Sequence, residues 1–150
     1  QAKLTASDAA QSDRFGLACD LNEDGNYAIV SSSNNVTVYI FTRSGSTWSE
    51  QQAIANPDAT ANNFGYDVSI NSDGNLFLVG GRTDAGAGYT NAGAAYFYSR
   101  TGTTWSQESK VYANDAATGN FFGASVSISD GDSAIVGAYN ANAGYIFVKG

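Results

Sequence analysis

The chain has 150 residues, 43% of them hydrophobic, which suits one folded domain with a core and argues against a disordered segment. Its 14 acidic and 7 basic residues give a formal net charge of −7, which disfavours nucleic acid because phosphate contacts need clustered lysine and arginine. No apolar run approaches the roughly 18 residues of a membrane span, so we expect neither a nucleic-acid partner nor a membrane span.

Three copies of one pattern follow one another along the chain. Each copy begins with a Phe-Gly pair, continues through alternating apolar and polar residues, and reaches an Asp-Gly pair. The Phe-Gly pairs begin at Phe15, Phe64 and Phe122, which are 49 and 58 residues apart. A period near 50 residues is typical of propellers and repeat arrays.

Each repeat predicts four β-strands in order. The alternation after Phe-Gly indicates a strand with one apolar face, and Asp-Gly indicates a hairpin turn. The second strand is apolar on both faces, as at 27–30, so it must be covered on both sides. An aromatic third strand and a glycine turn then lead to a fourth strand after Trp48 or Trp105. We expect both tryptophans to pack between blades.

Four short strands per repeat predict an all-β fold of propeller blades packed face to face. We place blade 1 at about residues 9–58, blade 2 at about 59–115 and blade 3 at about 116–150. Gly80 and Gly137 follow the second strands, where we expect the chain to pass close to a neighbouring blade.

The third repeat ends after its third strand, at Gly150. Residues 2–6 align with the fourth strands that end at 53–58 and 110–115, so we predict that this N-terminal strand completes the last blade, within one chain or between chains.

Closure of a ring sets the expected assembly. Propellers contain about four to eight blades, so three do not complete a circle. Two chains that exchange their N-terminal strands would make six blades, and this homo-oligomer is the favoured interpretation. A head-to-tail polymer and a fragment of a longer propeller are the alternatives.

The combined pattern resembles the FG-GAP repeat, which forms the propeller of integrin α subunits and occurs in many secreted or surface proteins. The copy that begins at Phe122 is the best match, whereas Ser31 and Ser32 replace Gly-Ala in the first copy. The resemblance implies an extracellular or cell-surface module for adhesion, recognition or structural assembly. A lectin-like module that binds a protein or glycan ligand is the alternative.

The resemblance also implies a calcium loop. Asp20, Asn22 and Asp24 stand in a D-x-N-x-D-G pattern, and oxygen ligands at alternate positions before a glycine turn can hold Ca²⁺. Ala28 occupies the position at which the integrin-like loop has a final acid. We therefore favour a hairpin capped by Asp and Asn, and expect no cofactor, with Ca²⁺ as the alternative.

An insertion of eight residues distinguishes the second repeat and gives the segment 82–93. Loops on a rigid scaffold often carry binding, although surface decoration without a ligand is the favoured interpretation. The candidate ligand-binding residues are Arg82, Asp84, Tyr89 and Asn91. Separately, Asn35 begins an Asn-Val-Thr triplet and is a candidate glycosylation site.

Catalysis finds little support in the composition. Histidine is absent, and Cys19 is the only cysteine, so the chain has no intrachain disulfide and no activated thiol. Cys19 is expected to be a small buried hydrophobe. We expect no enzyme, and a glycoside hydrolase-like enzyme using scattered carboxylates is the least favoured alternative.

Overall fold

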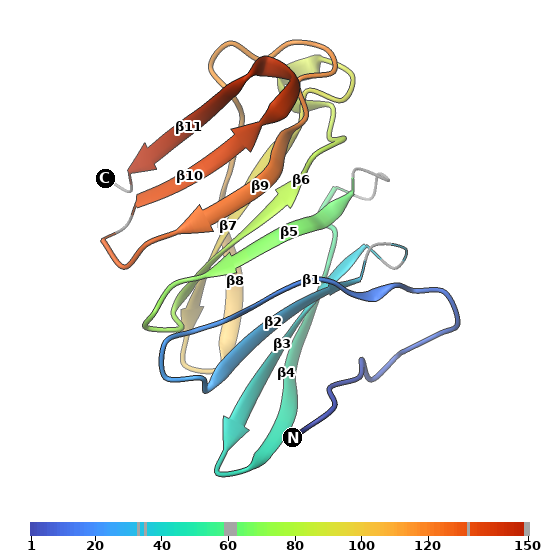
Figure 1. The fold of residues 1–150 in the computed structure, drawn as a ribbon, viewed down its shortest axis with the longest axis vertical. Helices are drawn as coiled ribbons and strands as arrows, with labels where there is room; N and C mark the ends of the chain where they lie inside the picture. Colours follow the sequence, from blue (N-terminus) through green and yellow to red (C-terminus); the bar gives the residue numbers. More distant parts are fainter. Residues whose placement is uncertain (33, 35, 59–62, 132, 149–150) are drawn as a thin grey trace.

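The computed structural model describes residues 1–32, 34, 36–58, 63–131 and 133–148, which form three antiparallel sheets of four, four and three strands (Figure 1). Blade 1 contains β1 (Phe15–Leu21), β2 (Tyr27–Ser32), β3 (Thr37–Ser44) and β4 (Thr47–Ala55). Blade 2 contains β5 (Phe64–Ile70), β6 (Leu76–Gly81), β7 (Ala94–Thr101) and β8 (Thr104–Val111). Blade 3 contains β9 (Phe122–Ile128), β10 (Ser133–Ala138) and β11 (Ala143–Val148). Two short 3-10 helices, η1 (Gly86–Gly88) and η2 (Tyr139–Ala141), follow the second strands of blades 2 and 3.

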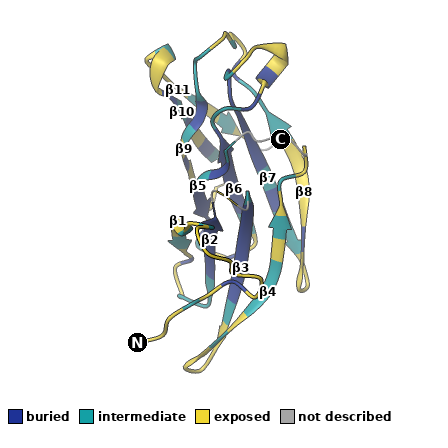
Figure 2. Ribbon diagram, turned by 90° about the vertical axis from the view of Figure 1, so that its right-hand side faces the viewer, coloured by how far each residue is buried: buried dark blue, intermediate teal, exposed yellow. Residues whose placement is uncertain are grey.

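The blades stand in a row, with the first strands β1, β5 and β9 side by side (Figure 1). Buried residues are concentrated in the strands of the central blade and its two junctions, whereas the N-terminal segment is largely exposed (Figure 2). The predicted all-β architecture with repeated blades is therefore confirmed. Among the described residues, no helix is long and apolar enough to cross a membrane.

The phenylalanine of each Phe-Gly pair packs edge-on against a tyrosine of the third strand. The ring centroids are 5.5 Å apart in blade 1, 5.1 Å in blade 2 and 5.4 Å in blade 3, within the usual range for aromatic pairs. One recurring contact thus ties the first strand to the third in every blade. The pairs are Phe15–Tyr39, Phe64–Tyr96 and Phe122–Tyr145.

The same tyrosines donate hydrogen bonds from their hydroxyl groups to aspartates that precede each blade. The oxygen–oxygen distances are 2.7 Å to Asp8, 2.6 Å to Asp58 and 2.7 Å to Asp115. A charged acceptor makes these strong hydrogen bonds. They fix where the chain enters each blade.

The glycine of each Phe-Gly pair has a positive φ, between 83° and 91°, which a residue with a Cβ rarely adopts. At the junction of blades 2 and 3, a Cβ on Gly80 would overlap the carbonyl oxygen of Gly123. The expected crowding at Gly80 is confirmed. At Gly137 a Cβ would meet only the hydroxyl oxygen of Ser125, a side chain that can rotate away.

The N-terminal segment departs from its prediction. Residues 2–6 form no strand, because β11 lies at the opposite end of the row from the N-terminus and cannot be reached within one chain (Figure 1). Instead, Leu4 and Ala6 pack on the outer face of blade 1, in a cluster with Phe41.

Trp105 packs at the junction of blades 1 and 2, as predicted. Its ring lies 4.8 Å from that of Phe77, and its Nε1 donates to the side chain of Gln51. Strands β4 and β8 each begin one residue before their tryptophan. Trp48 is only partly buried, since it belongs to the outer-face cluster of blade 1.

Cys19 is exposed, contrary to expectation. It lies on β1 opposite Val30 of β2, on the face of blade 1 that points away from blade 2. The alternation of β1 was interpreted correctly as a strand with an apolar face, but that face has no neighbouring blade within the described chain.

Gly80→Ala should lower the free energy of unfolding by about 2–3 kcal/mol, because the backbone of Gly123 must move to admit the methyl group. Gly131→Ala, in an exposed hairpin where a Cβ would meet nothing within 4 Å, is the matched control and should cost less than about 1 kcal/mol. Denaturant titration of both variants measures the difference. Equal losses would contradict the close approach of the two backbones.

Candidate functional site

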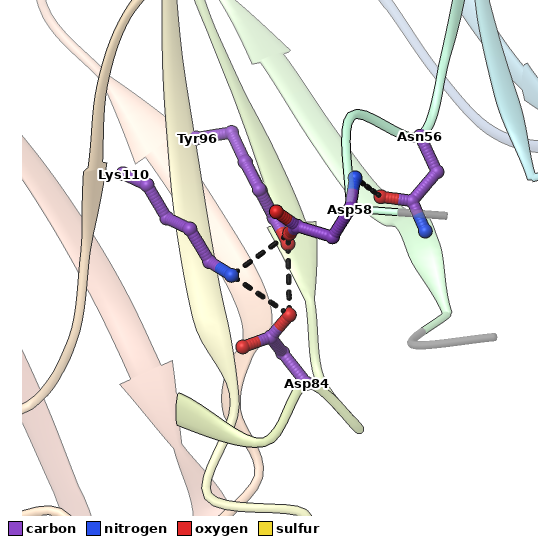
Figure 3. Close-up of polar contacts among 5 residues, drawn as sticks. All are labelled: Asn56, Asp58, Asp84, Tyr96 and Lys110. Carbon is purple, nitrogen blue, oxygen red and sulfur yellow. Dashed lines mark hydrogen bonds and ion pairs between the residues drawn. The ribbon is translucent and has the colours of Figure 1, made fainter. Parts of the chain in front are cut away.

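A partly buried cluster of opposite charges lies beside the third and fourth strands of blade 2 (Figure 3). Lys110 Nζ is 2.8 Å from Asp58 Oδ2 and 3.0 Å from Asp84 Oδ2. The Tyr96 hydroxyl lies 2.6 Å from the first of these oxygens and 3.0 Å from the second. The backbone N–H of Asp58 donates to Asn56 Oδ1 at 3.1 Å, which holds this aspartate in place.

Two charged members of the cluster are largely shielded from water: the side chain of Asp84 is 6% exposed and that of Lys110 is 19% exposed. Burial opposes the charge of Lys110, but hydrogen bonds to Asp58 and Asp84 outweigh it and raise the pKa of the amine. Burial likewise opposes the charge of Asp58, but hydrogen bonds from Lys110 and Tyr96 hold its pKa below the ordinary value. Burial, and then the bond to Asp58, raises the pKa of Tyr96.

Comparison of the blades separates the shared part of the cluster from the part specific to blade 2. The Tyr–Asp bond occurs in all three blades. In register, Tyr96 stands opposite Lys110 on β8, whereas Tyr39 stands opposite Ala53 on β4. Asp84 belongs to the insertion, so Lys110 supplies the charge that compensates this added buried carboxylate. With its pKa raised, Lys110 is a structural cation and a poor general base.

The insertion is fixed at its far end by backbone hydrogen bonds. Carbonyl oxygens at its end accept from N–H groups just before and at the start of β9, at 2.8–3.1 Å. The glycine-rich segment therefore closes onto blade 3 and does not project as a free loop. The acceptor–donor pairs are Thr90–Gly119, Asn91–Phe121 and Ala92–Phe122.

The four residues predicted to bind a ligand do not gather on one surface. Asp84 points into the cluster with Lys110, and Asn91 contributes its main chain to the junction with blade 3. Tyr89 is 50% exposed on the insertion. Arg82 packs its guanidinium on the ring of Tyr66, 4.1 Å from the centroid.

Two aromatic residues extend the Arg82 contact, and sequence analysis missed both. The Arg82 guanidinium lies 5.7 Å from the ring centroid of Phe121, which stacks on Tyr139 at 5.3 Å and 9°. Arg82 Nε is buried without a hydrogen-bond partner among the described residues. Arg82 and Tyr139 each follow the second strand of a blade, and Phe121 precedes a Phe-Gly pair. Alignment of the repeats could therefore have indicated that these residues lie near a junction between blades.

The three candidate calcium ligands are engaged by separate groups. Asp20 Oδ2 accepts from the backbone N–H of Ile70 at 2.9 Å, across the junction with blade 2. Asn22 Oδ1 accepts from backbone N–H groups within the hairpin, one of them that of Tyr27 at 2.8 Å, and Asp24 Oδ1 accepts from the N–H of Asn26 at 2.8 Å. These contacts cap the hairpin and join two blades.

Within the described ranges, no group of three or more His, Cys, Asp or Glu side chains is arranged to hold a metal ion. The candidate glycosylation residue, Asn35, lies outside the described residues.

Comparison with known proteins identifies the repeat. A family model described as "FG-GAP repeat" matches residues 1–46, 48–98 and 105–148. A comparison with curated proteins found no match.

Two solved structures share the fold, one from Bacteroides fragilis and one from Bacteroides uniformis, both provisionally assigned as 6-phosphogluconolactonases. Their TM-scores are both 0.63, with 19% and 12% identity over 88% of this chain. The match covers 34% and 35% of those chains, so this chain spans about a third of their length. At this identity the likeness shows the fold alone.

Lys110→Met should lower the free energy of unfolding by about 2–3 kcal/mol, because Asp84 would stay buried without its cation. Adding Asp84→Asn removes that buried negative charge and should recover much of the loss. Denaturant titration of both variants tests the pairing. If the double variant is less stable than Lys110→Met by a further 2 kcal/mol or so, the two residues act independently.

Asp58 should make the protein sensitive to acid. Its pKa is lowered in the folded state, so its contribution to stability is complete above the unfolded value, near 3.8, and is lost as the pH falls through the folded pKa. Between about pH 5 and pH 2, the melting temperature of the wild-type protein should therefore fall further than that of Asp58→Asn. Parallel melting curves for the two proteins would show that Asp58 carries no such linkage.

Proposed function

This chain belongs to the FG-GAP repeat family, and on that premise we propose that it is a non-catalytic assembly module whose end blades pack against those of a second copy. One observation supports this proposal above all. Positions that are buried between neighbouring blades inside the chain are exposed at both ends of the row.

The outer face of blade 3 illustrates the pattern. Ile29 of β2 and Leu78 of β6 are completely buried against the next blade, whereas Ile135, at the same position of β10, is 46% exposed. On the adjoining strand, Ile40 is completely buried and its counterpart Ile146 is 66% exposed. These are the side chains that a following blade would cover.

The outer face of blade 1 is the complementary half. Val68 and Ile70 of β5 are 4% and 5% exposed because blade 1 covers them. The corresponding residues of β1 are Cys19, which is exposed, and Leu21, which is 56% exposed. The two ends therefore present the two sides of one junction, and the junction is already formed twice within the chain.

Small residues also match across the two ends. A Cβ on Gly65 would lie 3.0 Å from the Cβ of Ser31, and Gly80 meets Gly123 at the next junction. The corresponding pair at a junction between copies is Gly137 with Gly16. Gly16 has open space around its Cβ position, which suits close approach of a second backbone.

A closed pair of chains suits the energetics better than a single contact. Burying one leucine or isoleucine side chain contributes about 1.5–3 kcal/mol, against an association cost of about 4–15 kcal/mol. A ring of two copies forms two junctions for one such cost. Six blades also fall within the usual range of about four to eight.

Ile146→Glu and Leu21→Glu should each abolish the two-chain species, because each places a charge on an apolar end face. A mixture of the two variants keeps one intact junction and should form a pair of lower affinity. Light scattering across a concentration series provides the masses, and Tyr89→Glu on the insertion is the matched control. Wild-type protein that stays a single chain at high concentration would overturn the proposal.

A further inference from the structure

The N-terminal segment lies on blade 1 as a fourth strand lies on the blade that follows it. Asp8 accepts from Tyr39 at 2.7 Å, just as Asp58, which follows β4, accepts from Tyr96 at 2.6 Å. Leu4 packs on blade 1, and its counterpart Ile54 packs in the core shared by blades 1 and 2. The segment therefore lies where the fourth strand of a preceding blade would lie, although it forms no strand within one chain.

The free edge of β11 is the place for such a strand. Among the described residues, β3 pairs with β4 and β7 with β8, whereas β11 pairs only with β10. The two complete blades share one register, with Tyr39 opposite Ala53 and Tyr96 opposite Lys110. Transferred to blade 3, this register sets Lys3 opposite Tyr145 and Ala2 opposite Ile146.

That register would bring a positively charged side chain of one copy next to a negatively charged side chain of the other. In blade 2, Lys110 Nζ lies 2.8 Å from Asp58, the aspartate that also accepts from Tyr96. Blade 3 has the same acceptor pair, Tyr145 and Asp115, joined at 2.7 Å, and Asp115 is exposed. The described part of blade 3 has no fourth strand, so within it no lysine occupies the position that Lys110 has in blade 2. In blade 1 the lysine position is Ala53, so this ion pair is a specific feature and does not belong to every blade.

We propose that residues 2–6 of a second copy pair with β11, and that Lys3 of that copy forms an ion pair with Asp115. The inference rests on the proposed association of end faces and on the expectation that residues 2–6 complete the last blade, and it adds the register and the charge pair. Because the paired strand would shield this ion pair partly from solvent, the pair contributes more to affinity than an exposed surface pair does.

A second contact at the same junction agrees with this docking. Arg82 of blade 2 lies 5.7 Å from the ring of Phe121, the residue just before the next Phe-Gly pair. At a junction between copies the corresponding residues are Tyr139, which is 54% exposed, and Arg14, which is also exposed. In the junction between copies the ring would come from the earlier blade and the cation from the later one, the reverse of Arg82 and Phe121. An attractive contact between a cation and an aromatic ring is therefore still expected.

A charge exchange tests the ion pair. Lys3→Glu should raise the dissociation constant of the pair of copies at least about tenfold. Asp115→Lys should raise it further, because it also removes the bond from Tyr145, and the double variant should recover the part that is due to the ion pair. Asp73→Lys, at the exposed hairpin of the central blade, is the control for a change of net charge. Sedimentation equilibrium measures the constants, and circular dichroism verifies that each variant is folded. Losses that simply add in the double variant would overturn the pairing.

A cross-link tests the register. In a Cys19→Ser background, a mixture of Ala2→Cys and Ile146→Cys chains should form a disulfide between copies, because opposed strand residues have a Cα separation that a disulfide can bridge. Thr5→Cys mixed with Ile146→Cys is displaced by three residues, about 10 Å, and should not cross-link. Equal cross-linking in both mixtures would refute the register.

The two proposals fail in distinguishable ways. If the wild-type chain does not associate, the assembly function itself is wrong. If it associates, and Ile146→Glu prevents this while Lys3→Glu leaves the dissociation constant unchanged, the end faces dock and the strand pairing alone is wrong.

Discussion

The hydrogen bond from a third-strand tyrosine to the aspartate that precedes its blade is the contact on which the rest of the structure depends. It joins the end of one segment to the middle of the next blade at 2.6–2.7 Å in all three repeats. The phenylalanine of Phe-Gly packs on the same tyrosine ring. One residue therefore fixes both the interior of a blade and the path by which the chain arrives there.

The repeat made the strands and their order predictable. Alternation after Phe-Gly, the Asp-Gly hairpins and the doubly apolar second strands each depend on local periodicity, and the structure has strands at those places. The packing of Trp105 was also predictable, because its position recurs in the framework. Such features are encoded within short segments, where a single sequence is informative.

The charged cluster and the path of the insertion were not predictable in the same way. Lys110 lies 52 residues from Asp58 and 26 from Asp84, so their contact depends on strand register and on the folding of the insertion. Asp84 was assigned to a possible ligand site because its neighbours are polar and glycine-rich, whereas burial directs it inward. Cys19 was misjudged because the apolar face of a strand says nothing about whether a blade covers it.

The Asp8–Tyr39 bond has a kinetic consequence. Exchange of a terminal segment between proteins usually begins with its release from the parent chain, and that opening is a slow step. Here the bond already holds residues 2–8 against blade 1 in the place that a donated strand would occupy, with Ala6 buried beneath it. Two copies that meet would exchange strands without opening either one, so encounter rather than unfolding would set the rate of assembly.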